Sequence, residues 1–145
     1  VYIPSNVSLS ATMNTADRSL GTIDYAIRRR FAFVTIKPIE LEEDNFNAEL
    51  FRKVSELFIA NYDEYANDGF NDRIKLIPAE TLCEEYRPED VWIGQSYFLM
   101  EDDSEVKNRL RFEVIPLLEE YVRDGVLTNE AQETIDELYH ILTSE

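Results

Sequence analysis

Cysteine and histidine are nearly absent from this chain of 145 residues, which contains one of each, Cys83 and His140. A single cysteine cannot form an intramolecular disulfide, and one cysteine with one histidine cannot build a thiolate or histidine-rich metal site. The two residues are also too far apart in the sequence to suggest a Cys-His or Ser-His-Asp catalytic set. We therefore predict no metal-binding residues in this chain.

Long hydrophobic runs are missing as well. A membrane-spanning helix needs about 20 mostly apolar residues, and no stretch of the chain approaches that length. No charged segment followed by an apolar one, typical of a secretory leader, is present. The sequence therefore predicts a cytoplasmic location and no membrane partner.

Basic residues are few relative to acidic ones, 14 against 30, and the formal net charge is −16. Residues 1–37 hold five basic and two acidic side chains, a balance of +3, which leaves −19 for residues 38–145. Such an acidic surface repels phosphate backbones, so this part of the chain is a poor candidate for direct contact with duplex DNA. Solubility is the simpler explanation of the charge.

A concentrated polar stretch lies near the N-terminal end. Val7, Leu9 and Ala11 alternate with serines, which predicts a β-strand over residues 6–11. The strand is followed by the run Met13-Asn-Thr-Ala-Asp-Arg-Ser19, and ligands bind at the carboxyl ends of strands in α/β sheets. A short helix over residues 24–30 and a second strand over residues 31–36 complete a predicted strand–loop–helix–strand unit.

The run from Met13 to Ser19, followed by Arg-Arg-Arg-Phe at positions 28–31, resembles the AAA+ module of the McrB family. Two further segments are similar to that family: Ile93-Gly-Gln-Ser-Tyr-Phe98, and the run 115–121, to which we assign only packing. The resemblance implies the C-terminal part of an AAA+ P-loop NTPase module, mostly helical overall. It comprises an α/β remnant over residues 1–38 and an all-α lid over residues 39–145.

The resemblance also implies roles for residues of the polar loop. Asn14 takes the place of sensor 1, the side chain that orients the attacking water toward the γ-phosphate; the alternative is an asparagine that caps its own turn. Thr15, Asp17 and Arg18 would face the nucleotide at a subunit boundary. The alternative for Asp17 and Arg18 is a surface ion pair, which contributes little to stability.

The resemblance also implies a catalytic role for Arg28 and Arg29. They would form an arginine finger that reaches the γ-phosphate held by a neighbouring subunit. The alternative is a solvated helix end whose positive charges suit the helix dipole. In the third segment, Gly94, Gln95 and Ser96 are predicted to contact the nucleotide or an interface. The family usually has histidine where this chain has Gln95, and glutamine keeps a donor and an acceptor but cannot become cationic.

Glycine is scarce too: the chain has four, and none stands in a Gly-x-x-x-x-Gly-Lys-[Ser/Thr] phosphate loop. An apolar strand ending in Asp-Glu, which would hold Mg²⁺, is also missing. Because the chain starts at Val1 without methionine and just ahead of a predicted strand, we expect it to be the C-terminal portion of a longer protein. We expect this portion alone neither to bind a nucleotide tightly nor to hydrolyse it.

For the parent protein, the resemblance implies the GTP-hydrolysing motor subunit of a McrBC-like, prokaryotic DNA restriction system. Its cofactors would be GTP (or ATP) and Mg²⁺. Its partners would be further copies of itself in a ring, expected to be a hexamer, a McrC-like nuclease subunit, and DNA bound through a domain outside this chain. The alternatives are an AAA+ ATPase of the chaperone or remodelling type and a non-catalytic helical interaction module.

The acidic remainder of the chain shows helical periodicity. We expect one long helix with its apolar face between Phe46 and Tyr65, a helix over residues 78–86, a turn over residues 87–90, and a helix start over residues 91–100 in which Gly94 permits close backbone approach. Four side chains of the last segment should belong to the core of the lid: Trp92, Ile93, Tyr97 and Phe98. A helix capped by Ser104 should run to Arg123 and kink or break near residues 112–115, because Pro116 lacks a backbone donor. Gly125 should stop it, and Thr128 should cap the last helix.

Overall fold

Apolar side chains spaced three and four residues apart build the helices of this protein. The computed structural model describes residues 4, 6–13 and 29–143. The chain divides into two compact units, Val1–Ala32 and Phe33–Glu145. The helices of the second unit are, in order, α2 (Ala48–Ser55), α3 (Tyr62–Asn67), α4 (Pro88–Val91), the 3₁₀-helix η2 (Gln95–Phe98), α5 (Asp103–Arg109), the π-helix η3 (Leu110–Val114), α6 (Ile115–Arg123) and α7 (Ala131–Thr143).

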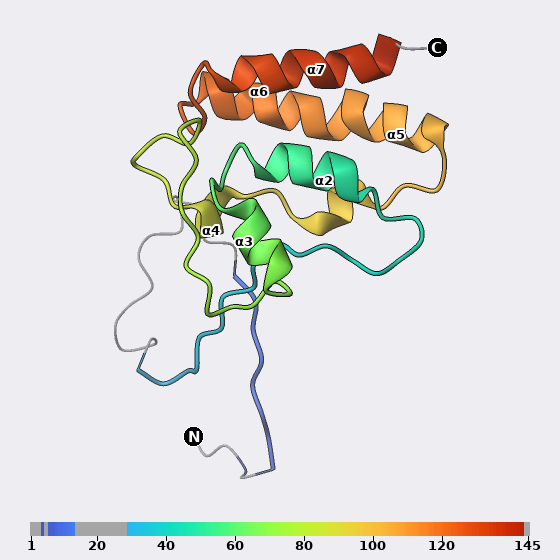
Figure 1. Cartoon of the computed structure of the whole chain (residues 1–145). Helices are drawn as coiled ribbons and strands as arrows, with labels where there is room; N and C mark the ends of the chain where they lie inside the picture. The colour runs from blue at the N-terminus through green and yellow to red at the C-terminus, as the bar shows by residue number, and fades with distance from the viewer. Residues whose placement is uncertain (1–3, 5, 14–28, 144–145) are drawn as a thin grey trace. The chain divides into compact units, whose positions relative to one another are not determined.

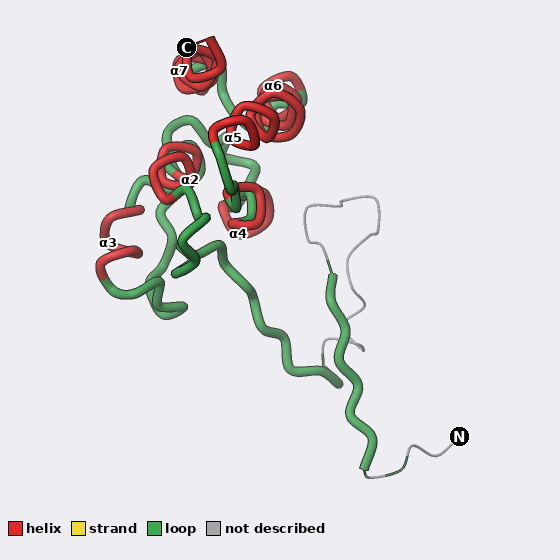
Figure 2. The backbone as a smooth tube through the Cα atoms, turned by 90° about the vertical axis from the view of Figure 1, so that its right-hand side faces the viewer, coloured by secondary structure: helices red, strands yellow, loops and turns green. Residues whose placement is uncertain are grey.

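The helices of the second unit pack around one apolar core. α5, η3 and α6 follow one another along a single rod, and α7 lies beside that rod (Figure 1). Figure 2 views α2, α5, α6 and α7 nearly end-on, so their axes run in broadly similar directions. The largest fully buried side chains are aromatic: Tyr65, Phe51, Phe58 and Phe98. Burial of such side chains is the main stabilising contribution in a domain of this size.

Strands were predicted over residues 6–11 and 31–36, and both predictions are wrong for this structure. Along the described residues no strand is formed, and both segments run without a β-ladder (Figure 2). Their apolar side chains are exposed, up to 79% for Val34 and 82% for Ile36. An alternating pattern produces a strand only where another strand accepts its backbone hydrogen bonds, and the described residues offer none. The predicted helix over residues 24–30 lies outside the described residues except at its end.

The single long helix expected from Phe46 to Tyr65 is instead two helices, α2 and α3. The prediction of burial is confirmed, because the expected apolar side chains from Leu50 onward are in the core and Phe46 packs against it. The helix breaks because the backbone of residues 58–60 pairs with residues 77–79: the N–H of Ala60 donates to the Ile77 carbonyl at 2.8 Å and the N–H of Ala79 to the Phe58 carbonyl at 3.1 Å. Tertiary hydrogen bonds here replace the helical ones.

The helix predicted over residues 78–86 is absent, and helix α4 occurs where we expected a turn. Residues 78–86 form turns, held by two backbone hydrogen bonds to the segment after α6: Cys83 N–H to the Val126 carbonyl at 3.0 Å and Thr128 N–H to the Thr81 carbonyl at 2.8 Å. Pro88, not Pro78, occupies the first helical position. Arg87 before it is extended, as residues before proline usually are.

The break predicted near Pro116 is confirmed and takes the form of the π-helix η3. The N–H of Ile115 donates to the carbonyl of Leu110, five residues back, and α6 begins at Ile115. The wider turn accommodates the proline, which has no N–H to donate. The predicted cap at Ser104 is wrong: the Asp102 side chain accepts from the Glu105 N–H at 2.8 Å, and α5 starts two residues earlier than predicted.

Gly125 ends α6 as predicted, with φ of +72°, a conformation that favours glycine. The packing assigned to residues 115–121 is also confirmed, since Ile115 and Leu118 are buried. Thr128, however, does not cap α7. Among the described residues its hydroxyl has no hydrogen-bond partner, and the Ala131 N–H bonds to the Thr128 backbone carbonyl instead.

The segment before α2 is fastened to the helical unit at Lys37. The ammonium group donates to the backbone carbonyls of Asp72 at 2.8 Å and Ile74 at 3.0 Å, and it lies 5.7 Å from the centre of the Tyr65 ring. Glu40, three residues after Lys37, forms a second contact: its carboxylate accepts a hydrogen bond from the Tyr62 hydroxyl. Burial, and then this hydrogen bond, raise the pKa of Tyr62 well above its usual range. Residues 37–40 thus belong structurally to the helical unit.

Among the helices that the structure describes, none is both long enough and apolar enough to cross a membrane.

Candidate functional site

The segment Gly94–Ser96 stands between two buried stretches of chain. Trp92 and Ile93, which precede it, are 7% and 4% exposed, and Phe98, which follows it, is fully buried. The sequence-based prediction that Trp92, Ile93 and Phe98 are core residues is confirmed, and Tyr97 packs against the core while partly exposed. The core therefore holds both ends of a three-residue segment whose own side chains are not needed for packing.

The N-terminal end of this segment is held through Trp92. Its indole stacks on Phe51 of α2, with ring centres 6.0 Å apart and an interplanar angle of 19°, and meets the edge of Tyr65 of α3 at 6.0 Å. The indole N–H donates to the Ser55 hydroxyl at 3.0 Å. The backbone N–H of Trp92 bonds to the carbonyl of Pro88, so α4 continues directly into the segment.

The C-terminal end is held by backbone pairing with the residues that lead into α2. The N–H of Asn47 donates to the Phe98 carbonyl at 2.8 Å, and the N–H of Met100 donates to the Asn45 carbonyl at 2.7 Å. The Phe98 ring meets Phe51 edge-on at 5.4 Å, the same ring on which Trp92 stacks. One phenylalanine of α2 thus fixes both ends of the segment.

Within the segment, Gln95 is half-buried and Ser96 is exposed, both in η2. Among the described residues their side chains make no hydrogen bond, so an amide and a hydroxyl are presented from a rigid base. The expected close backbone approach at Gly94 is not found: φ is −68°, and a Cβ placed there would meet nothing within 4 Å. Its backbone does not require glycine.

Of the predicted catalytic residues, Asn14, Asp17 and Arg28 lie outside the described residues, as do the predicted nucleotide or interface residues Thr15 and Arg18. Arg29 is described and exposed, and it belongs to the first unit. The predicted site residues that the helical unit contains are therefore Gly94, Gln95 and Ser96. For the catalytic group the roles remain predictions.

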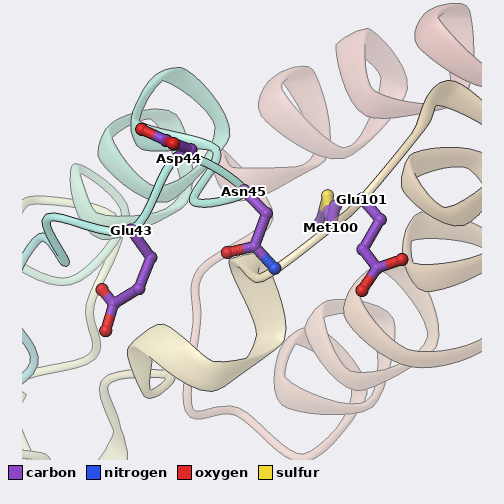
Figure 3. A pocket seen from close by; sticks show the side chains of 5 residues that line it. All are labelled: Glu43, Asp44, Asn45, Met100 and Glu101. Carbon is purple, nitrogen blue, oxygen red and sulfur yellow. The ribbon is translucent and has the colours of Figure 1, made fainter.

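A shallow hollow of about 570 Å³ lies where the chain enters α2 and leaves η2 (Figure 3). Its lining includes Glu43, Asp44 and Glu101, with the Asn45 amide between the acidic side chains of residues 43 and 101. Carboxylates repel phosphate oxygens, so this hollow is unsuited to a triphosphate. Within the described ranges no group of three or more His, Cys, Asp and Glu side chains is arranged to hold a metal ion.

Sequence reasoning missed Ser55, whose hydroxyl holds Trp92. It had placed the neighbouring apolar residues on the buried face of a helix and passed over a serine between them. The signal that points to it is the single tryptophan of the chain. A buried indole N–H needs an acceptor, and small hydroxyl side chains inside an apolar face are the first place to look for one.

The helical unit and its presented segment match a known class of domain. Residues 70–129, which include Gly94–Ser96, match the family model described as "McrB, alpha-helical lid domain". Over 130 residues, 85% of its length, the chain is 36% identical to the "Type IV methyl-directed restriction enzyme EcoKMcrB subunit" of Escherichia coli (strain K12). Residues 70–129 are thus a lid domain of the McrB type, and the chain spans 27% of the length of that relative. No solved structure matches it significantly.

Proposed function

We propose that this chain is the sensor, arginine-finger and lid portion of a GTP-hydrolysing AAA+ motor subunit in a McrBC-like DNA restriction system. The observation that carries the proposal is the position of Gly94–Ser96: the family match to the McrB lid spans it, and the structure presents it on a rigid, buried base. The similarity to a restriction enzyme subunit over 85% of the chain supports the same assignment.

In this proposal the lid segment contacts the nucleotide. The Gln95 amide offers an NH₂ donor group beside a carbonyl acceptor, which suits the edge of a base or a ribose hydroxyl. The Ser96 hydroxyl adds a second, rotatable hydrogen-bonding group. Neither side chain is cationic, so the segment contributes recognition of the nucleoside and leaves the phosphates to other groups.

The reaction itself falls to the N-terminal unit. Asn14 orients the attacking water, with Thr15, Asp17 and Arg18 arranged around it at a subunit boundary. Arg28 and Arg29 act on a triphosphate bound by the neighbouring subunit, where a planar, permanently charged guanidinium stabilises the charge of the transferring phosphoryl group. Parts of the protein outside this chain would hold Mg²⁺, which neutralises phosphate charge.

Because the proposed arginine finger acts on a nucleotide bound by a neighbouring subunit, the protein must form an oligomer to be active. A site shared between subunits needs a neighbouring copy of the protein, for which we propose a ring of six, with a McrC-like nuclease as partner and DNA bound by a domain outside this chain. The charge of the described helical unit agrees with that placement of DNA, because residues 38–145 carry a formal −19. We propose that this chain by itself is inactive.

The test compares variants in the full-length protein. Arg28→Ala or Arg29→Ala should lower GTP turnover about 10³-fold, as loss of a finger does, while the affinity for a non-hydrolysable GTP analogue stays near the parent value. Asn14→Ala should slow hydrolysis in the same way. Arg111→Ala, at an exposed position on η3 in the lid, is the matched arginine control.

Four results would contradict the proposal. Parental turnover in both arginine variants would remove the finger, and a parental rate in Asn14→Ala would leave that residue as a turn residue. Preference for ATP over GTP would favour an AAA+ ATPase of the remodelling type. Absence of any nucleotide binding by the full-length protein would favour a helical interaction module.

A further inference from the structure

We propose that Ser55 is a positioning residue for the segment Gly94–Ser96, acting through Trp92. The inference rests on the proposed function of that segment as a nucleotide contact. It assigns a role to a residue on another helix, α2, which does not touch the segment's presented side chains.

The first step is the burial of Ser55. Ser55 is a polar residue that is fully buried in the apolar core, with no exposed area. Its hydroxyl donates to the Phe51 carbonyl at 2.6 Å and accepts from the Trp92 indole N–H at 3.0 Å. Because the proton is directed at the carbonyl, the lone pairs of the oxygen are left for the indole. The Ser55 oxygen can therefore accept the hydrogen bond of the Trp92 indole N–H from one defined direction.

The second step is what the hydrogen bond adds to the packing of Trp92. The stacked ring of Phe51 and the edge of Tyr65 fix the plane of the indole. Stacking alone tolerates sliding and rotation within that plane, because dispersion contacts are not directional. The hydrogen bond selects one orientation, since any other leaves a buried N–H without a partner.

The third step connects the indole to the segment. Gly94 lies two residues after Trp92, and the backbone is extended at both residues, with ψ of 129° at Trp92 and 156° at Gly94. An extended backbone passes a shift of Trp92 directly to Gly94. The other end, at Phe98, is held by a hydrogen bond to Asn47 and does not depend on the serine. Ser55 therefore sets the start of the segment and leaves its end in place.

The experiment measures affinity and turnover in the full-length protein. Ser55→Ala should weaken binding of a non-hydrolysable GTP analogue roughly fivefold, the equivalent of one ordinary hydrogen bond. The value of kcat at saturating GTP should stay within about twofold of the parent, since the lid segment does not act on the transferring phosphoryl group. Ile135→Val is the control: it removes one methylene from a fully buried side chain of α7 and lowers stability alone.

A double-mutant cycle separates positioning from general loss of structure. Trp92→Phe keeps an aromatic ring and removes the indole N–H, so adding Ser55→Ala to it should weaken analogue binding no further. Fully additive losses in affinity would overturn the inference, as would a Ser55→Ala affinity equal to that of Ile135→Val.

Failure of the proposed function would look different. Gln95→Ala and Ser96→Ala test the contact itself. If both leave analogue affinity at the parent value, the nucleotide contact is wrong and the inference falls with it. If they weaken binding and Ser55→Ala behaves like the Ile135→Val control, the contact stands and the positioning role of Ser55 is refuted.

Discussion

Replacing Lys37 by methionine tests whether the segment before α2 is fastened to the helical unit. The substitution keeps an unbranched side chain of similar length and removes the ammonium group. That group donates two hydrogen bonds, to the carbonyls of Asp72 and Ile74, and lies over the Tyr65 ring. All three interactions are lost together, which concentrates the effect in one change.

The magnitude follows from the surroundings of each contact. Hydrogen bonds from a charged donor contribute about 1.5–3 kcal/mol, and a cation over an aromatic ring near the surface about 0.5–1 kcal/mol. Asp72 is exposed and Ile74 only half-buried, so water can solvate the released carbonyls and recovers part of the loss. A methionine sulfur near the Tyr65 ring recovers a little more. We expect the free energy of unfolding to fall by about 1–2 kcal/mol.

Urea unfolding of the 145-residue chain, followed by circular dichroism, measures this change. The slope of the transition should stay constant and its midpoint should fall. Lys75→Met is the matched control: it makes the same charge change at an exposed lysine whose side chain forms no hydrogen bond or ion pair among the described residues, and it should shift stability by less than about 0.5 kcal/mol. Equal shifts in the two variants would refute the reasoning and leave net charge as the cause.

Three further outcomes are expected. Burial raises the pKa of Tyr65 to about 12 and that of Tyr62 well above its usual range. The folded state then holds two protons that the unfolded state releases above pH 10, so the contribution of these two residues to the free energy of unfolding should be constant below pH 10 and fall between pH 10 and 12. Their share of the tyrosinate absorbance at 295 nm should appear only as the chain unfolds. Gly125→Ala should cost about 1 kcal/mol because φ is +72°, whereas Gly94→Ala, at φ of −68° with open space around it, should raise the urea midpoint slightly because alanine restricts the unfolded chain. Leu118→Ala, in the fully buried seam between α6 and α7, should cost about 2–5 kcal/mol in the same assay, and a loss below 1 kcal/mol would contradict its place in the core.

Periodicity predicted burial better than it predicted helix ends. The spacing from Leu50 to Tyr65 gives the buried face correctly, because side chains three and four residues apart face the same way in α2 and α3 alike. It cannot show that residues 58–60 hydrogen-bond to residues 77–79, since a backbone donor carries no residue-specific signal. The break between the two helices was therefore invisible in the sequence.

Proline and glycine gave correct local predictions where their chemistry acts on the backbone directly. Pro116 and Gly125 mark the π-turn and the end of α6, because one lacks a donor and the other tolerates positive φ. Pro78 gave a wrong prediction, the helix over residues 78–86. Proline occurs at the edge of paired backbone as well as in a first helical turn, and here Pro78 forms an isolated bridge with Ile59.

In the candidate site, too, local features could be predicted from the sequence and long-range contacts could not. Sequence similarity located Gly94–Ser96 and predicted the burial of Trp92, Ile93 and Phe98, and the structure confirms that burial. The partner of the indole could not be predicted, because Ser55 lies 37 residues earlier and nothing in either local sequence refers to the other. Contacts of this kind depend on the packing of α2 against the chain after α4.

The π-helix η3 has an evolutionary consequence. It holds one residue more per turn than its neighbours, and Phe112, at 69% exposure, occupies the outward side of that turn. Loss of one residue there would restore an ordinary helical turn, with Leu110 and Val114 changing from four to three residues apart and still facing inward. Homologous chains can thus differ in length at this turn while keeping the same interior.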